Sequence, residues 1–154
     1  MKKTCCVLAG LLLLVCAGMA YKFLIQGSTA PASDGRTALL LEESERDMVL
    51  SEMRAFLVSV QGIVQSINNE DMPAVAAHAR GVGMATAGGV PGTLVGKLPA
   101  AFKKLGFGTH RSFDQLALDA EQLGDPQHAI EQLAELMGNC VACHATYRID
   151  IAGP

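Results

Sequence analysis

The sequence predicts an all-α protein, an antiparallel four-helix bundle preceded by an N-terminal hydrophobic segment. Tryptophan is absent and aromatic residues make up 5% of the chain, a composition that favours helices over a β-sandwich. Apolar residues recur at alternating steps of three and four along several stretches, as on the buried face of a helix. Short links with capping residues separate these stretches, and 154 residues suffice for one buried core.

The first 25 residues have the pattern of an export signal or a membrane anchor. Two lysines precede the uncharged run "CCVLAGLLLLVCAGMA", whose last three residues resemble a signal-peptidase site. Residues 5–25 would also span about 30 Å as a helix, enough to stay in the membrane with the lysines on its cytoplasmic side. Cleavage and retention both stay open, and both place the rest of the chain in the periplasm, soluble or tethered.

Residues 26–42 are predicted to link this segment to a helical domain at 43–154. The stretch "QGSTAPASDGR" is small, polar and rich in turn formers, as flexible connectors are. The "TALLLEE" that follows is expected to lie extended against the domain.

The first helix of the domain is expected to begin at Ser44, a common N-cap residue. Glu45 and Asp47 suit the positive end of the helix dipole, and "NNED" (68–71) ends the helix. Steps of four and three along its buried face predict contact with a helical partner. This face comprises Val49, Met53, Phe56, Val60, Ile63 and Ile67.

The second helix is expected after Asp71, a capping aspartate, with Pro73 tolerated in its first turn. Residues 87–96 are then predicted to be irregular. A short helical piece is expected before Thr109, which is predicted to cap the third helix. The apolar positions are Met72, Ala76, Ala79 and Val82 in the second helix and Phe113, Leu116, Ala120 and Leu123 in the third.

The fourth helix follows "GDP" (124–126), which combines a C-terminal glycine, an N-cap aspartate and a first-turn proline. Its apolar face passes through the only two cysteines that lie outside the first sixteen residues. This face comprises Ile130, Leu133, Met137, Cys140, His144 and Tyr147.

The segment Cys140-Val-Ala-Cys143-His144 has the spacing of a c-type haem attachment site. Positions i, i+3 and i+4 of a helix share one face, so two thiols can form thioethers to one haem while the imidazole reaches its iron. A structural zinc site would need four ligands, and the remaining histidines form no second paired cluster. A thioredoxin-like pair would need a βαβ unit, and a disulfide within one helical turn would be strained.

Past the motif, the pattern Cys-x-x-Cys-His-x-x-Tyr-Arg at the end of the last predicted helix resembles the cytochrome c′ family. It is also similar to that family's low-spin relatives, which share the fold and add a methionine ligand. The resemblance covers roughly residues 43–150 and is sharp only over Cys140–Arg148. It implies one haem c held by Cys140 and Cys143, His144 as the proximal iron ligand, and Arg148 near the proximal face. Met137 is expected to line the haem pocket. Tyr147 falls on the same apolar face, where core packing and a redox role both stay open.

In the resembled family, the other haem face meets a residue of the first helix, apolar in gas-binding members and methionine in low-spin ones. An arginine tends to stand four residues before it. Arg46 stands four before Leu50, which would leave the iron five-coordinate. Met53, however, lies on the apolar face about fifteen residues before the helix end, and Met48 lies off that face. The sequence favours Met53 as the second metal ligand and keeps Leu50 as the alternative.

The expected function is therefore electron transfer between redox partner proteins by an exported c-type cytochrome. The alternative is a five-coordinate cytochrome c′ that binds NO or CO as a sensor or scavenger. No enzyme activity is expected, because nothing in sequence near Met53 resembles a distal acid–base pair, although folding could bring His110 close. His110 is predicted to be a helix-terminal or surface histidine.

The charge of the domain bears on its partners. Without residues 1–32 the chain keeps nine basic against fifteen acidic residues, a net charge of −6, and shows no basic cluster. A nucleic-acid partner is therefore not expected. By analogy with the resembled family, pairing of two copies through the first two helices is a further expectation.

Overall fold

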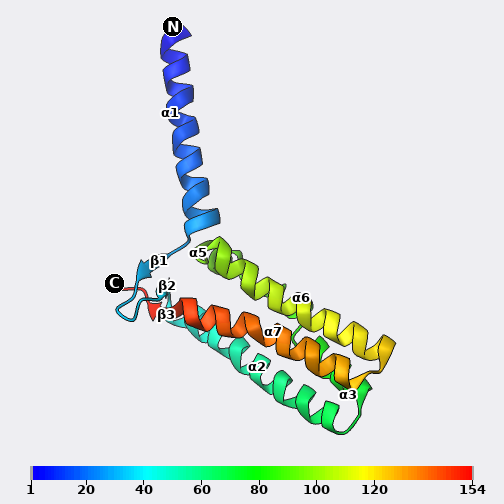
Figure 1. Cartoon of the computed structure of the whole chain (residues 1–154). Helices are drawn as coiled ribbons and strands as arrows, with labels where there is room; N and C mark the ends of the chain where they lie inside the picture. Colours follow the sequence, from blue (N-terminus) through cyan, green and yellow to red (C-terminus); the bar gives the residue numbers. More distant parts are fainter. Residues whose placement is uncertain (1, 154) are drawn as a thin grey trace.

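The structure, a computed structural model, describes residues 2–153 and is mostly helical (Figure 1). Its helices are α1 (Lys2–Ala20), the π-helical η1 (Tyr21–Gln26), α2 (Glu43–Asn68), α3 (Met72–Arg80), α4 (Met84–Ala87), α5 (Gly92–Lys97), α6 (Ala100–Leu123) and α7 (Pro126–Thr146). Its strands are β1 (Thr29–Pro31), β2 (Thr37–Leu41) and β3 (Tyr147–Ile151). Helix α1 projects from the body, in which α2, α3, α6 and α7 pack together.

The N-terminal helix has the length and composition of a membrane-crossing segment. Among the residues searched, Cys6–Gln26 qualifies, with a hydropathy of 2.1 over its most apolar window and no burial inside the protein. An exposed apolar helix of this length suits a signal or an anchor.

Helix α2 begins earlier than predicted, because Glu42 and not Ser44 is its N-cap. The backbone N–H of Glu42 donates to Glu45 Oε2 at 2.9 Å, and Lys97 Nζ donates to the same carboxylate at 2.8 Å. Lys97 arrives from a distant part of the chain, so this cap could not be found from local sequence. The prediction at Asp71 is confirmed, since its Oδ1 accepts the Ala74 N–H at 3.0 Å.

Helix α6 runs without a break through the position where a new helix was predicted to start. Thr109 is 6% exposed, and its hydroxyl donates to the Leu105 carbonyl one turn back, at 2.9 Å. A threonine satisfied in this way is compatible with a helix interior and needs no capping role. The predicted cap is therefore wrong, and His110 lies in the middle of a helix.

The segment predicted as a linker forms part of a sheet, which an all-α prediction did not include. Strand β2 pairs antiparallel with β1 and parallel with β3, with Thr37 opposite Tyr147 and Leu41 opposite Ile151. Leu39 and Leu41 are completely buried. The last helix accordingly ends at Thr146. Tyr147 was predicted to lie on the face of this helix, but it is the first residue of strand β3.

The interior contains two apolar clusters. The helical cluster lies among α2, α3, α6 and α7, and the sheet cluster lies beneath β2 and α5. Met53 is partly buried and packs against both. Because α3 ends at Arg80, at the end of the body farthest from α1, the long helices lack a full-length fourth neighbour nearer the sheet (Figure 1).

A glycine joins the N-terminal helix to the body, and we expect its replacement by alanine to be costly. Gly27 has φ +67°, and a Cβ there would lie 2.7 Å from the Pro99 nitrogen and closer still to the Lys97 carbonyl oxygen. Gly35 has φ +83° but open space around it, so Gly35→Ala should cost only about 1–2 kcal/mol. Gly27→Ala should lower the midpoint of urea unfolding clearly more, and equal losses would contradict this account.

Candidate functional site

A cavity of about 520 Å³ lies between the two apolar clusters. This size is typical of pockets that hold small molecules and cofactors. Its walls come from α2, α6 and α7 and from the α4–α5 region, and they are mostly apolar. The lining includes the predicted site residues Leu50, Met53, Met137, Cys140, Cys143 and His144.

The two cysteines and the histidine of the motif therefore line one cavity, as their spacing on α7 predicts. Cys140 and Cys143 are partly buried free thiols, and His144 is exposed. Burial raises the pKa of both thiols, with Cys140 adding to the effect at Cys143. Both are thus protonated at neutral pH, unlike the low-pKa thiolate of a redox-active pair.

A second cavity, of about 250 Å³, lies toward the sheet. Met53 and His144 line both cavities, from α2 and α7 respectively, and Leu50 does so too. Leu50 is 39% exposed, whereas Met53 is partly buried. Three arginines also line the smaller cavity, namely Arg36, Arg46 and Arg148.

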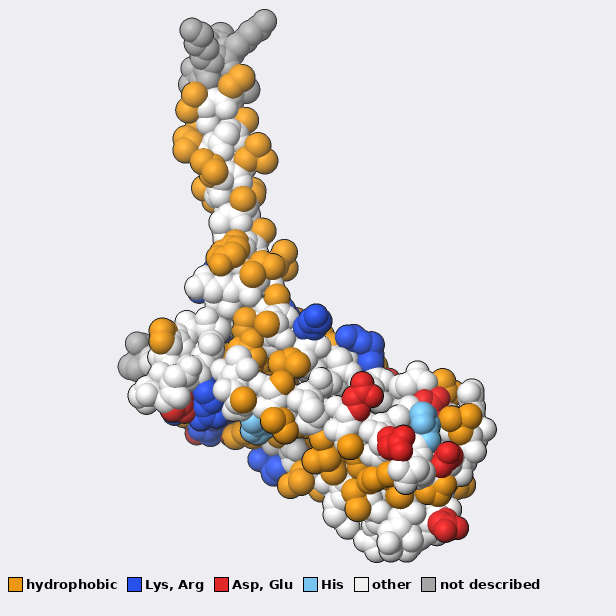
Figure 2. All heavy atoms as spheres, in the orientation of Figure 1, with side chains coloured by type: hydrophobic (Ala, Val, Ile, Leu, Met, Phe, Trp, Pro, Cys, Tyr) orange, Lys and Arg blue, Asp and Glu red, His pale blue; other side chains and the backbone are white. Residues whose placement is uncertain are grey.

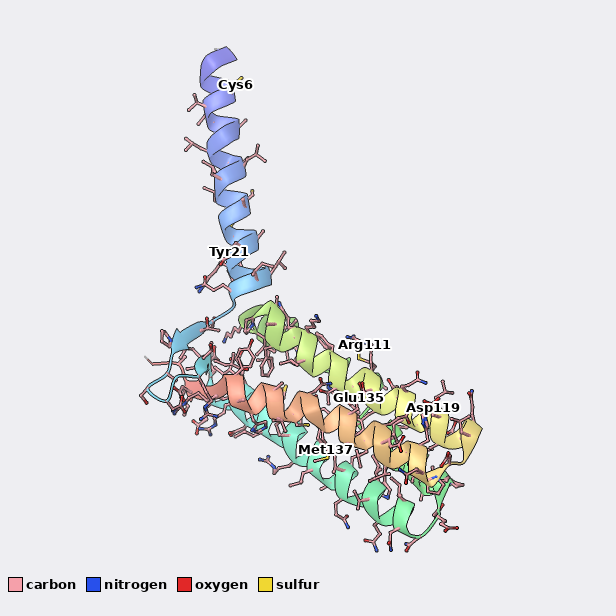
Figure 3. The ribbon with its side chains drawn as sticks, viewed as in Figure 1. Cys6, Tyr21, Arg111, Asp119, Glu135 and Met137 are labelled. Atoms are coloured by element: carbon pink, nitrogen blue, oxygen red, sulfur yellow. The ribbon has the colours of Figure 1, made fainter. Side chains whose placement is uncertain are left out.

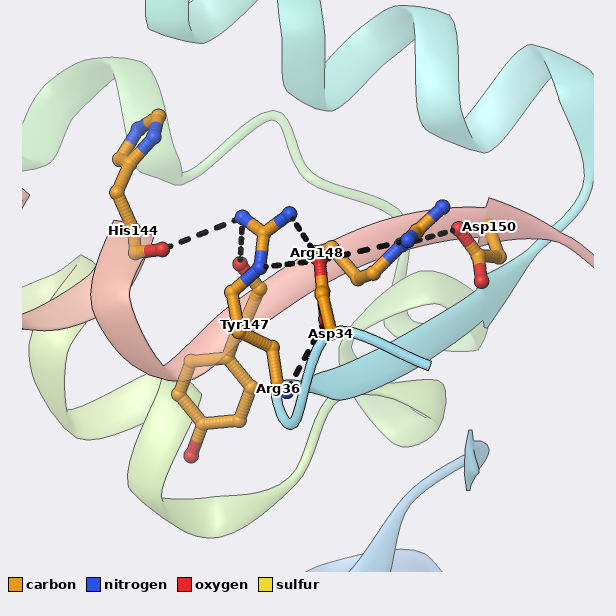
Figure 4. A network of polar contacts seen from close by, with 6 residues as sticks. All are labelled: Asp34, Arg36, His144, Tyr147, Arg148 and Asp150. Carbon is orange, nitrogen blue, oxygen red and sulfur yellow. Dashed lines mark hydrogen bonds and ion pairs between the residues drawn. The ribbon is translucent and has the colours of Figure 1, made fainter. Parts of the chain in front are cut away.

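Arg36 holds the end of α7 that carries the histidine (Figure 4). Its Nη1 donates to the carbonyl oxygens of His144 and Tyr147, both at 3.3 Å. Asp34 pairs with the same guanidinium at 2.7 Å, and the hydrogen bonds from Arg36 lower the pKa of Asp34 to about 2. Sequence reasoning missed Arg36, because it lies in the supposed linker and 108 positions from His144.

The residues after His144 lie in β3. Arg148 pairs with Asp150 at 2.8 Å and with Asp34 at 3.4 Å. The ring of Tyr147 meets that of Phe102 edge-on, with 5.4 Å between their centroids. Burial, and secondarily Cys143, raises the pKa of Tyr147. Tyr147 and Arg148 both line the smaller cavity, as His144 does.

His110 lies in the wall of the larger cavity, and the prediction of a surface or helix-terminal histidine is wrong. It is 4% exposed, and its ring centroid lies 4.9 Å from that of Phe56. Nδ1 lies 2.8 Å from the carbonyl oxygen of Val82, which only accepts, so Nδ1 carries a hydrogen. Nε2 lies 3.3 Å from Glu52 Oε1. Glu52 lines the same cavity and is the neighbour of Met53 in sequence.

Comparisons with known proteins find no match to this chain. No protein-family model matches it, and neither does a curated protein or a solved structure. These comparisons therefore assign no family or activity to the chain.

The His110–Glu52 pair should make stability depend on pH. Burial disfavours the charged imidazole, but the hydrogen bonds with Glu52 and the Val82 carbonyl outweigh it and raise the pKa of His110. Because the pKa of His110 is higher in the folded than in the unfolded protein, its protonation stabilises the fold. This contribution is fully present below the unfolded-state pKa, about 6.5, and is lost as the pH rises through the folded-state pKa. Wild type should therefore exceed Glu52→Gln in stability most at about pH 6 and less at about pH 9.

Urea unfolding at several pH values measures this difference. Glu43→Gln is the matched control, because Glu43 is 76% exposed and its contact with Arg46 is a surface ion pair. Its difference from wild type should not change with pH in the same range. If the stability difference between wild type and Glu52→Gln is the same at every pH, the pKa of His110 is not raised by Glu52.

The described residues of the site do not form a structural zinc site. Over the searched part of the chain, no group of three or more His, Cys, Asp or Glu side chains is placed to hold a metal ion. A structural zinc ion takes four such ligands. The two thiols and the imidazole of the motif therefore lack the partners that zinc would need.

Proposed function

We propose that this chain is an exported c-type cytochrome, a four-helix-bundle protein that carries one haem and transfers electrons between redox partners in the periplasm. The observation that carries the proposal is the lining of a single apolar cavity by Cys140, Cys143 and His144, with Met53 from another helix. The four bundle helices would be α2, α3, α6 and α7, of which α3 is the shortest.

The residues present fit a covalently bound haem. The cavity is large and mostly apolar, as a macrocycle requires, and the two free thiols at its wall are available for thioethers. Three arginines line the smaller cavity, and each already pairs with an aspartate of the chain. A haem carboxylate at this place would share these guanidinium groups with those aspartates.

In this proposal Cys140 and Cys143 would hold the haem through thioethers, and His144 and Met53 would be the ligands of its iron. The bound group supplies a one-electron iron couple. A methionine ligand such as Met53 would raise the reduction potential of that iron. Arg36 fixes the backbone that carries His144, and the mostly apolar wall, which includes Phe56 and Leu94, would surround the bound group. Electron transfer converts no substrate, so the proposed function includes no enzyme activity.

The alternative function is a gas-binding cytochrome c′ with Leu50 beside an open iron position. The observation in its favour is that Leu50 lines both cavities, as Met53 does. The half-exposed Leu50 is less well placed for a dry pocket than the more buried Met53, and this difference favours the electron carrier.

Absorption spectra of the loaded protein, oxidised and reduced, with and without carbon monoxide, test the proposal. We expect a low-spin ferric spectrum with a near-infrared methionine–iron charge-transfer band and little change on adding carbon monoxide. A high-spin spectrum that shifts readily with carbon monoxide would favour the gas-binding alternative. A chain that carries no covalent haem after export through a competent maturation system would contradict both.

A further inference from the structure

The N-terminal helix is joined to the body by a fixed connection. The Ser28 N–H donates to the Lys97 carbonyl oxygen at 2.7 Å, and the Leu40 N–H donates to the Ser28 carbonyl oxygen at 2.8 Å. Gly27, at the end of η1, packs directly against the Lys97–Pro99 backbone. The segment that follows the N-terminal apolar helix is thus bonded to both α5 and β2, which sets the direction of the helix relative to the body.

A lysine of α6 marks the depth at which this helix would leave a membrane. Lys103 Nζ donates to the Leu24 carbonyl oxygen at 3.2 Å, within the last turns of the apolar Cys6–Gln26 segment. Tyr21 and Phe23, each 59% exposed, lie in the same turns. Aromatic residues and lysines are typical of the boundary between hydrocarbon and headgroups. If α1 spans a membrane, the first turns of α6 would lie at headgroup depth.

Unpaired positive charge collects on this side of an otherwise acidic domain. Of the ten basic side chains that the structure describes, five form ion pairs with carboxylates: Arg36, Arg46, Arg80, Lys97 and Arg148. Of the other five, four belong to η1 and α6, and Arg54 on α2 is the exception. These four are Lys22, Lys103, Lys104 and Arg111, and we call them the basic face.

The basic face is continuous with the base of the N-terminal helix. Lys104 and Arg111 are exposed and seven positions apart, so they lie on one side of α6. Figure 2 shows positive side chains along the body next to that base, and Figure 3 places Arg111 on the side of α6 turned toward α1. Helices α2 and α7 lie beyond α6 as seen from α1 (Figure 1).

We propose that the basic face lies against anionic phospholipid headgroups of the membrane that α1 spans, and so holds the domain in one orientation. Membrane surfaces rich in anionic lipid attract lysine and arginine within about one Debye length, some 8–10 Å. The acidic remainder of the domain is repelled from the same surface. Helices α2 and α7, with the cysteine motif, then face the aqueous compartment, where partners can approach. This inference does not depend on haem binding.

The absence of native tryptophan allows a direct test in the full-length chain. Ala101→Trp places a single reporter on the exposed side of α6, one turn before Lys104, and Leu123→Trp places a matched one at the far end of the same helix. Each variant is reconstituted in nanodiscs with brominated lipid, either zwitterionic or containing about one third phosphatidylglycerol. Comparing the two discs for each variant cancels any quenching inside the protein.

We expect phosphatidylglycerol to increase bromide quenching of Ala101→Trp but not of Leu123→Trp. The docking equilibrium constant, taken from the increase in quenching with phosphatidylglycerol, should fall about fivefold for each charge removed by Lys104→Gln and Arg111→Gln. About 1 M NaCl, where the Debye length is about 3 Å, should abolish the increase without any mutation. Quenching of Ala101→Trp that ignores lipid charge or salt would overturn the proposal. So would an intact mass showing that the membrane-bound chain in cells lacks residues 1–20.

Discussion

If Met53 is an iron ligand as proposed, replacing it with leucine should convert the haem-loaded protein from a low-spin to a high-spin form that binds carbon monoxide readily. Leucine has no ligating atom, so the sixth position of the iron would lose its ligand. The reduction potential should fall by on the order of 0.1 V, because axial ligands account for much of the range of about 0.8 V among haem proteins. The substitution conserves volume and should cost less than about 1.5 kcal/mol of stability. Absorption spectra and a redox titration measure both effects.

Met48→Leu is the matched control, since it makes the same chemical change on the same helix. Met48 lines only the larger cavity and is 44% exposed, whereas Met53 lines both cavities and packs against both apolar clusters. The control should keep the low-spin spectrum. Loss of the methionine band in Met48→Leu, with Met53→Leu unaffected, would move the ligand to Met48. A wild-type protein already high-spin would leave Leu50 beside the open position.

The helices that the sequence predicted well are those that begin and end on local signals. Gly124 adopts φ +63° after α6, and Asp125 Oδ1 accepts the Gln127 N–H at 2.9 Å at the start of α7. Glycine, aspartate and proline each act within one helical turn, so the three adjacent residues 124–126 determine the connection between α6 and α7. The shared lining by Cys140, Cys143 and His144 likewise follows from helical spacing alone.

The features that sequence reasoning missed depend on contacts between distant parts of the chain. Strand β2 is parallel to β3, which lies more than one hundred positions away in the sequence. Helical periodicity predicts that Tyr147, the first residue of β3, is part of the last helix, so this pairing could not be expected. His110 was misplaced because Thr109 resembles a cap, while its hydroxyl in fact bonds the preceding turn. The contact with Glu52 then required α2 and α6 to be adjacent, which helix periodicity alone does not specify.

Truncation of Phe113 to alanine should be among the most destabilising single changes in the domain, at about 3–5 kcal/mol. Phe113 is completely buried and stacks on Phe56, with 5.4 Å between centroids and 8° between ring planes. Folded domains are stable by only about 5–15 kcal/mol, so this loss should approach global unfolding. Leu123→Ala at the end of the same helix should change stability by about 0.5 kcal/mol or less, since Leu123 is 60% exposed.

Urea unfolding of the two variants compares these losses, and it also tests how the cavity is built. Phe56 lines the larger cavity and Phe113 does not, so the stacked pair forms the boundary between the cavity and the helical cluster. Removing Phe113 would extend the cavity into that cluster and release the ring beside His110. A loss near that of Leu123→Ala would mean that the surrounding helices collapse onto the space, and the cavity would then lack the rigid floor that a bound cofactor needs.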